Sequence, residues 1–282
     1  MATFYNQATL SYSGGTVNSN ITTGEILEVL SATKTAVIGE YSQGSEVPYV
    51  INIINSGNTD FTDLTVTDNL GAYEFDSAEK QPLEYVENSV KYFADGVLLA
   101  TPAVTAGPPL EISGITVPAN GEATIIYVAR VNGFAPPTAA GTIENTAVIS
   151  GGITEITVTA CITAAAEPVL GITKSVSPAT VSENGELTYT FVIKNTGNTA
   201  AEAEDNVVVT DLFDPALSNI TVAYNGETWA SPANYSYDET TGQFATASGG
   251  ITVPAATFTQ DPSTGEWITE PGTATLTVTG TI

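Results

Sequence analysis

The sequence predicts an all-β protein with two tandem β-sandwich domains preceded by an N-terminal arm. Short alternating runs of β-branched and aromatic residues are broken by Gly, Pro and Asn turns, and no window has a helical hydrophobic period. A set of motifs also occurs twice in the same order. The 282 residues, 42% of them hydrophobic, are enough for two domains that each bury a core.

The expected strands are runs of Val, Ile, Thr and Tyr that alternate in polarity and end at turn residues. Such alternation is typical of strands with one face on a core, and many short strands separated by turns indicate a sandwich or barrel. The clearest examples span residues 47–55, 64–70, 123–131, 187–194 and 273–279.

Four landmarks show that the chain is an internal duplication. Lys34 and Lys174 lie in similar segments, and Gly-Asn-Thr at 57–59 matches 197–199. Val-Thr-Asp at 66–68 matches 209–211, and Ile-Thr-Val-Pro-Ala at 115–119 matches 251–255. Because the order is the same, we assign 23–163 and 164–282 as repeated domains, joined through the Ala-Ala-Ala-Glu-Pro segment at 164–168.

The two repeats differ in their final strand. Repeat 1 contains Asn-Thr-Ala-Val-Ile-Ser-Gly-Gly at 145–152, and no such strand occurs in repeat 2 up to residue 282. A similar strand, Asn-Gln-Ala-Thr-Leu-Ser at 6–11 with Gly-Gly at 14–15, precedes repeat 1. We therefore expect residues 1–22 to be an arm carrying a spare final strand, and domain 2 to lack its own.

Three kinds of polar residue fall on apolar strand faces. Residues i and i+2 share a face, so Lys34 lies with Ala32 and Ala36, and Asp68 with Leu64 and Val66. Lys174 and Asp211 occupy the corresponding positions in repeat 2, and Asn145 shares its face with Ala147 and Ile149. Buried polar groups need partners, so these residues are expected to meet in the core.

Four kinds of motif occur in order along the chain: the Lys-Thr and Lys-Ser strands, the N-S-G-N and N-T-G-N turns, the V-T-D strand ends and the N-T-A-V-I-S strand. Together they resemble a conserved repeat domain of bacterial surface proteins. That family is catalogued as domain of unknown function eleven. The resemblance covers nearly the whole chain twice, and it implies extracellular, immunoglobulin-like modules that form fibres or stalks. The arrangement is also similar to collagen-adhesin-type isopeptide domains, in which a first-strand Lys bonds to a last-strand Asn beside an Asp.

This resemblance implies candidate crosslinking residues. In domain 1 they are Lys34, Asp68 and Asn145. Between subunits they are Lys174 and Asp211 of one chain and Asn6 of another, delivered by a donor strand whose inward face is Phe4, Asn6, Ala8, Leu10 and Tyr12. The alternative is a buried Lys–Asp ion pair whose hydrogen bonds are completed by the Asn.

Composition excludes several classes of function. A formal net charge of −25 with six Lys plus Arg leaves no basic patch for nucleic acid or anionic membranes. There is no histidine, and no catalytic or phosphate-loop motif is present, so an enzyme is not expected. No cofactor or metal is expected either. The acidic loops around Asp60 and Glu202–Asp205 read as solvated surface in preference to calcium sites.

The remaining chemistry is sparse. The single cysteine, Cys161, is either a small buried side chain or a candidate for an interchain disulfide. Trp229, Trp267 and nearby tyrosines are either core and contact residues or a sugar-binding surface, with packing favoured.

These observations predict a self-assembling filament subunit, because an open-ended domain and a matching spare strand form a heterologous contact that propagates. Closure within one chain would require the arm to span roughly 40 Å with about ten residues of slack, so exchange between chains is favoured. The alternative is a monomeric surface adhesin that binds a host protein or glycan. We expect a bacterial cell or spore surface location; no secretory signal is recognisable, and any anchor protein or host ligand is unknown.

Overall fold

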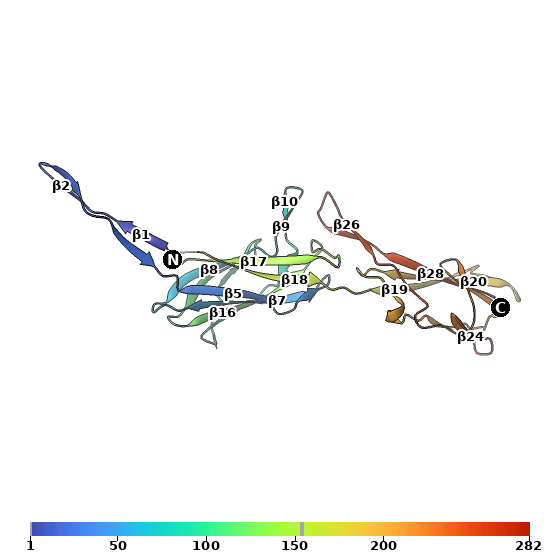
Figure 1. Ribbon diagram of the computed structural model, residues 1–282. Helices are drawn as coiled ribbons and strands as arrows, with labels where there is room; N and C mark the ends of the chain where they lie inside the picture. The colour runs from blue at the N-terminus through green and yellow to red at the C-terminus, as the bar shows by residue number, and fades with distance from the viewer. Residues whose placement is uncertain (1, 153–154) are drawn as a thin grey trace. The chain divides into compact units, whose positions relative to one another are not determined.

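The computed structural model describes residues 2–152 and 155–282, which fold as two compact units (Figure 1). Unit 1 runs to Asn132 and includes Ile143–Ile162, whereas unit 2 comprises Gly133–Thr142 and Thr163–Ile282. The boundary after Ile162 lies one residue before the expected one. The segment Gly133–Thr142, which the sequence placed in domain 1, groups with unit 2.

Unit 1 is an immunoglobulin-like sandwich of two antiparallel sheets. The first sheet has the order β13 (Val97–Leu98), β12 (Lys91–Ala94), β16 (Glu122–Val131), β7 (Glu46–Asn55) and β5 (Leu30–Ala36), with β11 (Leu83–Tyr85) also pairing with β16. The second has the order β14 (Ala103–Thr105), β15 (Leu110–Val117), β8 (Phe61–Asp68), β17 (Thr142–Ser150), β18 (Ile156–Ala164) and β6 (Glu40–Tyr41). A small hairpin joins β9 (Tyr73–Phe75) and β10 (Ala78–Lys80).

The core of unit 1 follows from the two-residue period of its central strands. Alternate residues of β7 and β16 are buried, and Tyr49 stacks on Tyr127 with ring centroids 5.4 Å apart. Removing these faces from water is the main stabilising contribution of such a sandwich. The predicted strands at 47–55 and 123–131 are confirmed by β7 and β16.

Unit 2 repeats this plan with fewer strands. One sheet has the order β19 (Leu170–Ser177), β20 (Glu186–Asn195), β28 (Gly272–Thr281), β22 (Ser218–Tyr224) and β23 (Glu227–Trp229). The other contains β21 (Thr210–Leu212), β25 (Gln243–Thr246) and β24 (Tyr235–Asp238), and a separate hairpin pairs β26 (Thr257–Gln260) with β27 (Trp267–Glu270). The short 3₁₀ turn η1 spans Ala203–Asp205. Tyr224 and Tyr235 belong to the unit 2 core and Trp229 packs against it, which confirms packing roles for these aromatic residues.

The missing strands of unit 2 leave one sheet with an open edge. In unit 1, β8 lies between β15 and β17. Its counterpart β21 has only three residues and pairs with β25, and no strand of the described part of unit 2 occupies the other edge. With one partner, β21 has about half of the ladder hydrogen bonds that a strand between two neighbours has.

The arm forms its own antiparallel hairpin. Strand β1 (Ala2–Asn6) pairs with β4 (Thr22–Ile26), and β2 (Thr9–Tyr12) pairs with β3 (Gly15–Asn18). The arm therefore extends to Ile26, beyond the expected residue 22. Its strands are largely exposed on both faces. Among the described residues, no helix has the length and apolar character needed to cross a membrane.

Candidate functional site

The lysine of unit 1 is buried in an ion pair. Strand β5 points Lys34 inward between the two sheets, and its Nζ lies 2.7 Å from Oδ2 of Asp68 on β8. Both side chains have an exposed fraction of 0%. The inward orientation expected from strand periodicity is therefore confirmed for both residues. An ion pair without solvent requires further hydrogen bonds to offset desolvation.

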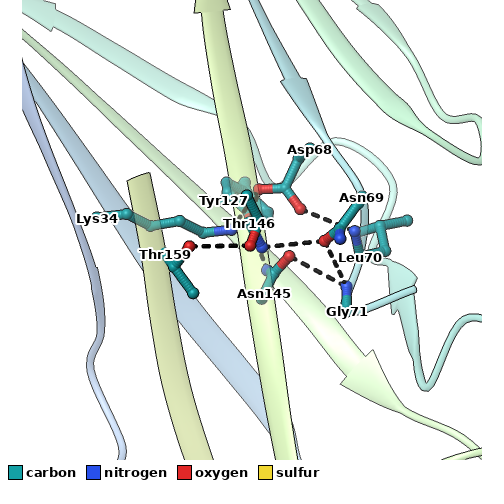
Figure 2. A network of polar contacts seen from close by, with 9 residues as sticks. All are labelled: Lys34, Asp68, Asn69, Leu70, Gly71, Tyr127, Asn145, Thr146 and Thr159. Atoms are coloured by element: carbon teal, nitrogen blue, oxygen red, sulfur yellow. Dashed lines mark hydrogen bonds and ion pairs between the residues drawn. The ribbon is translucent and has the colours of Figure 1, made fainter. Parts of the chain in front are cut away.

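Those further bonds come from Tyr127 and Asn145 (Figure 2). The Tyr127 hydroxyl donates to Asp68 Oδ2 at 2.5 Å and accepts from Asn145 Nδ2 at 2.9 Å. The backbone N–H of Gly71 donates to Asn145 Oδ1 at 3.2 Å. The structure thus brings together all three residues predicted from the sequence and adds a fourth, Tyr127. The sequence feature that could have identified Tyr127 was an aromatic hydroxyl on the inward face of β16. An ordinary core tyrosine has the same feature.

Glycine is required at position 71. Its φ of +73° favours glycine, and a Cβ there would lie 2.6 Å from Ile143 Cγ2. The turn from Asp68 to Gly71 is closed by two Asx-type bonds, from Leu70 N to Asp68 Oδ1 at 3.0 Å and from Gly71 N to Asn69 Oδ1 at 2.9 Å. This turn holds the Gly71 N–H against the Asn145 carbonyl oxygen.

Burial changes the acid–base properties of the site. Desolvation lowers the pKa of Lys34 to about 8, although the Asp68 charge and hydrogen bond oppose that change. Burial also raises the pKa of Tyr127, and the neighbouring Asp68 carboxylate adds to this effect. The neutral, nucleophilic form of the Lys34 amine is therefore more populated than in a solvated lysine. The neighbouring Tyr127 hydroxyl keeps its proton.

The arrangement suits amide exchange on the Asn145 side chain. Attack by the Lys34 amine on Asn145 Cγ would place negative charge on Oδ1, to which Gly71 N–H already donates. The leaving nitrogen, Nδ2, is hydrogen bonded to Tyr127, which is hydrogen bonded to Asp68. These contacts form a continuous route for a proton between the amine and the leaving group.

Unit 2 contains half of this site. Lys174 Nζ is hydrogen bonded to Asp211 Oδ2, and it lies 4.4 Å from the centroid of Tyr189, as Lys34 lies 5.0 Å from that of Tyr49. The side chains of Lys174 and Asp211 are 38% and 18% exposed. Lys174 therefore points toward Asp211 and the aromatic rings of unit 2, as strand periodicity predicted, but it is only partly covered because no strand of the described chain lies over it.

Two members of the unit 1 site have no equivalent in unit 2. Tyr127 lies opposite Tyr49, and the residue opposite Tyr189 is Val278, so the bridging hydroxyl is absent. The strand that carries Asn145 is also absent from the described part of unit 2. Asn6, its predicted substitute, lies opposite Thr22 in the arm hairpin and is exposed.

The other candidate sites have simpler explanations. Cys161 is exposed on β18, so the interpretation as a buried side chain is wrong, and the interchain disulfide stays a prediction. Asp60 accepts a hydrogen bond from Ala119 N at 2.8 Å, and Asp205 accepts one from Glu202 N at 2.8 Å. Within residues 2–152 and 155–282, no cluster of three or more potential metal ligands occurs.

No family model and no curated protein matches the chain, so membership of the resembled family is not shown. Solved structures similar to the chain include the RrgB pilus backbone of Streptococcus pneumoniae, with 13% identity over 86% of this chain and 55% of that one and a TM-score of 0.35. The BcpA major pilin of Bacillus cereus has 13% identity over 95% and 73%, with a TM-score of 0.37. The collagen-binding subdomain of Enterococcus faecalis ACE has 11% identity over 50% and 99%, with a TM-score of 0.32. The chain thus spans about half the length of the pneumococcal structure.

Proposed function

We propose that the protein is a structural subunit of an extracellular bacterial filament, a pilus or spore appendage, and that the arm of one subunit completes unit 2 of the next. One observation carries the proposal. The edge of β21 that is open in unit 2 corresponds to the edge of β8 that β17 occupies in unit 1, and the arm repeats the sequence of β17. An unpaired edge beside apolar surface is a site for strand addition.

The inward face of the arm matches that of β17 position by position. In β17 the buried face is Ile143, Asn145, Ala147 and Ile149. The corresponding arm residues are Phe4, Asn6, Ala8 and Leu10, with Phe4 and Leu10 now 52% and 64% exposed. Covering them in a neighbouring core would stabilise the contact by about 25 cal/mol for each Å² of apolar surface removed from water.

The acceptor unit exposes a complementary apolar surface. Strand β19 lies at a sheet edge, and Ile172 and Val176, on the same face as Lys174, are 54% and 40% exposed. In unit 1 the equivalent strand β5 has Lys34 buried. An inserted strand would cover the Lys174 face in unit 2 as β17 covers the Lys34 face in unit 1.

The same proposal includes covalent bonds. In unit 1, Lys34 Nζ would form an amide bond to Asn145 Cγ, the bond from Cγ to Nδ2 would break, and one ammonia would leave. Between subunits, Ala147 stands opposite Asp68 in unit 1, so Ala8 would stand opposite Asp211 and Asn6 would reach Lys174. That bond would join each subunit to the next without a cofactor.

The donor-strand step is tested with substitutions on the two faces of β2. Leu10→Asp places a charge on the inward face, and Ser11→Asp places the same charge on the outward face. Purified wild-type protein and Ser11→Asp should form filaments visible by electron microscopy, whereas Leu10→Asp should stay monomeric. Persistent wild-type monomers would favour the surface adhesin instead, and filaments formed by Leu10→Asp would rule out the arm as donor.

A further inference from the structure

We infer that the arm enters the neighbouring subunit as an intact two-stranded hairpin, with β3 and β4 supplying a second strand beyond the donor strand β1–β2. This inference rests on the proposed function and concerns the size of the inserted element. Compared with unit 1, the β21 edge of the unit 2 sheet lacks two strands, the counterparts of β17 and β18. In unit 1, β8 is followed in the sheet by β17, β18 and then β6, whereas in unit 2 the sheet stops at β21.

The segment that corresponds to β6 gives independent support. β6 comprises Glu40 and Tyr41, and in unit 1 it pairs with β18. The matching positions in unit 2 are Thr180 and Val181, which are not in a strand. Val181 is nevertheless partly buried against the unit 2 core. Residues 180–181 thus lie where a β6-like strand would form, and what they lack is a partner equivalent to β18.

The arm already has the form of the β17–β18 hairpin. The Thr146 and Thr159 hydroxyls lie 2.9 Å apart across β17 and β18, so Asn145 lies near Ala160 of the neighbouring strand. In the arm, Asn6 lies opposite Thr22, so the two hairpins turn back after nearly the same number of residues. Both also have Gly-Gly in or near the turn.

The second arm strand offers an apolar residue on the required face. Leu10 lies opposite Val17, and opposite residues of an antiparallel pair point to the same side of the sheet. Val17 is 52% exposed in the free arm. Farther along, the Phe4 ring lies over Gly24, where an added Cβ would be 2.3 Å from Phe4 Cζ. The large Phe4 and the small Gly24 thus lie opposite each other in the arm.

Energetics favour the hairpin over a single strand. A single strand would have to separate from β3 and β4 and lose the pairings from Ala2 to Asn6 and from Thr9 to Tyr12. It would then become the new sheet edge and expose its own unpaired backbone groups. An inserted hairpin keeps its internal hydrogen bonds, and its outer strand can pair with residues 180–181.

The test compares three full-length variants with wild type. Val17→Asp alters the inward face of β3, Thr16→Asp places the same charge on its outward face, and Leu10→Asp alters the donor strand. Hairpin insertion predicts that Val17→Asp slows filament growth by more than about tenfold and that Thr16→Asp grows like wild type, while Leu10→Asp stays monomeric. Insertion of β1–β2 alone predicts normal or faster growth of Val17→Asp, because weakening the free hairpin would release the donor strand.

Hydrogen exchange provides a second measurement. Amides at 180–181 should be protected in wild-type filaments and exposed in Leu10→Asp monomers, since they gain a strand partner only when the hairpin is inserted. Unchanged exchange there, together with wild-type growth of Val17→Asp, would overturn hairpin insertion and leave strand donation standing. Equal inhibition by Thr16→Asp would overturn the assigned face. Filament growth by Leu10→Asp would reject the proposed function as well.

Discussion

Tyr127 is the residue on which the proposed Lys34–Asn145 bond formation in unit 1 depends most. Its hydroxyl is hydrogen bonded to both Asp68 and Asn145, while its ring stacks on Tyr49. Tyr49 provides a comparison, because its buried hydroxyl has no hydrogen bond of normal geometry, although the nearby Asn145 side chain influences its pKa. Of these two stacked tyrosines, Tyr127 is the one hydrogen bonded to Asp68.

Tyr127→Phe should therefore slow formation of the Lys34–Asn145 bond about 100-fold, because the ring stays and the proton route is broken. Tyr49→Phe should react like wild type. Intact mass spectrometry after a short expression pulse measures the reaction, since each bond removes about 17 Da as ammonia. Equal mass loss in both variants at the earliest time would exclude a role for the Tyr127 hydroxyl in the reaction.

The lowered pKa of Lys34 predicts a pH-dependent stability where the bond cannot form. Burial lowers the pKa of Lys34 from 10.5 to about 8 in the folded protein, and we expect a shift in the same direction in Asn145→Ala. Between these values the unfolded chain binds more protons, so the free energy of unfolding should rise with pH by roughly 3 kcal/mol in total.

Calorimetry from pH 8 to 10 checks this increase. The comparison is the same variant with Lys34→Met and Asp68→Asn added, which removes the titrating amine and leaves no carboxylate unpaired. Both proteins retain Tyr49 and Tyr127, and burial keeps both hydroxyls protonated in the folded state across this pH range. A difference in unfolding free energy that is flat or falls with pH would show that Lys34 is not held as a desolvated amine.

At this scale the sequence predicted Lys34, Asp68 and Asn145, because a polar residue stands out on an apolar strand face. It could not single out Tyr127, since a tyrosine on such a face is also an ordinary core residue. For Lys174 the sequence predicted the inward direction but not the exposed fraction. Strand periodicity gives the direction of a side chain, and the exposed fraction depends on whether another strand covers it.

Among the strands, β21 and β8 are the informative pair. They are counterparts in the repeat, yet β8 has eight residues and two neighbours whereas β21 has three residues and one neighbour. The sequences around Asp68 and Asp211 are similar, and the strand that lacks a second neighbour is the shorter of the two. Repeat comparison predicted which strand would be absent, but no local pattern at 207–212 showed that β21 would shorten.

We expect the amides of Thr210–Leu212 to exchange at least about 100-fold faster than those of residues 66–68 in the unassembled Leu10→Asp protein, since an open edge has little protection. In wild-type filaments the two segments should become similar. Hydrogen-exchange mass spectrometry measures both in one experiment, and the amides of β20 and β28, which lie within a sheet, serve as an internal control. Strong protection of β21 in the monomer would mean that its edge is already covered.

The charge of the whole molecule gives a reason why a covalent bond between subunits would be useful. With a formal net charge of −25, neighbouring subunits of the proposed filament would repel one another, and their contact would depend on the inserted arm. Strand insertion can supply a ladder and an apolar face, but it remains reversible. A bond from Asn6 to Lys174 would make the same contact permanent. It should form more slowly than the bond in unit 1, because Val278 replaces the bridging hydroxyl of Tyr127.

Asn6→Ala is the variant that separates strand insertion from covalent linkage. Wild-type filaments boiled in detergent with reductant should give a ladder of multimers, whereas Asn6→Ala filaments should give only monomer while looking normal by electron microscopy. Gln7→Ala is the matched control, since it removes the adjacent amide on the opposite face and should keep the ladder. Reductant eliminates any multimers linked through Cys161. If wild-type filaments also collapse to monomer under these conditions, the interchain bond does not exist, and the filament is held by the inserted arm alone.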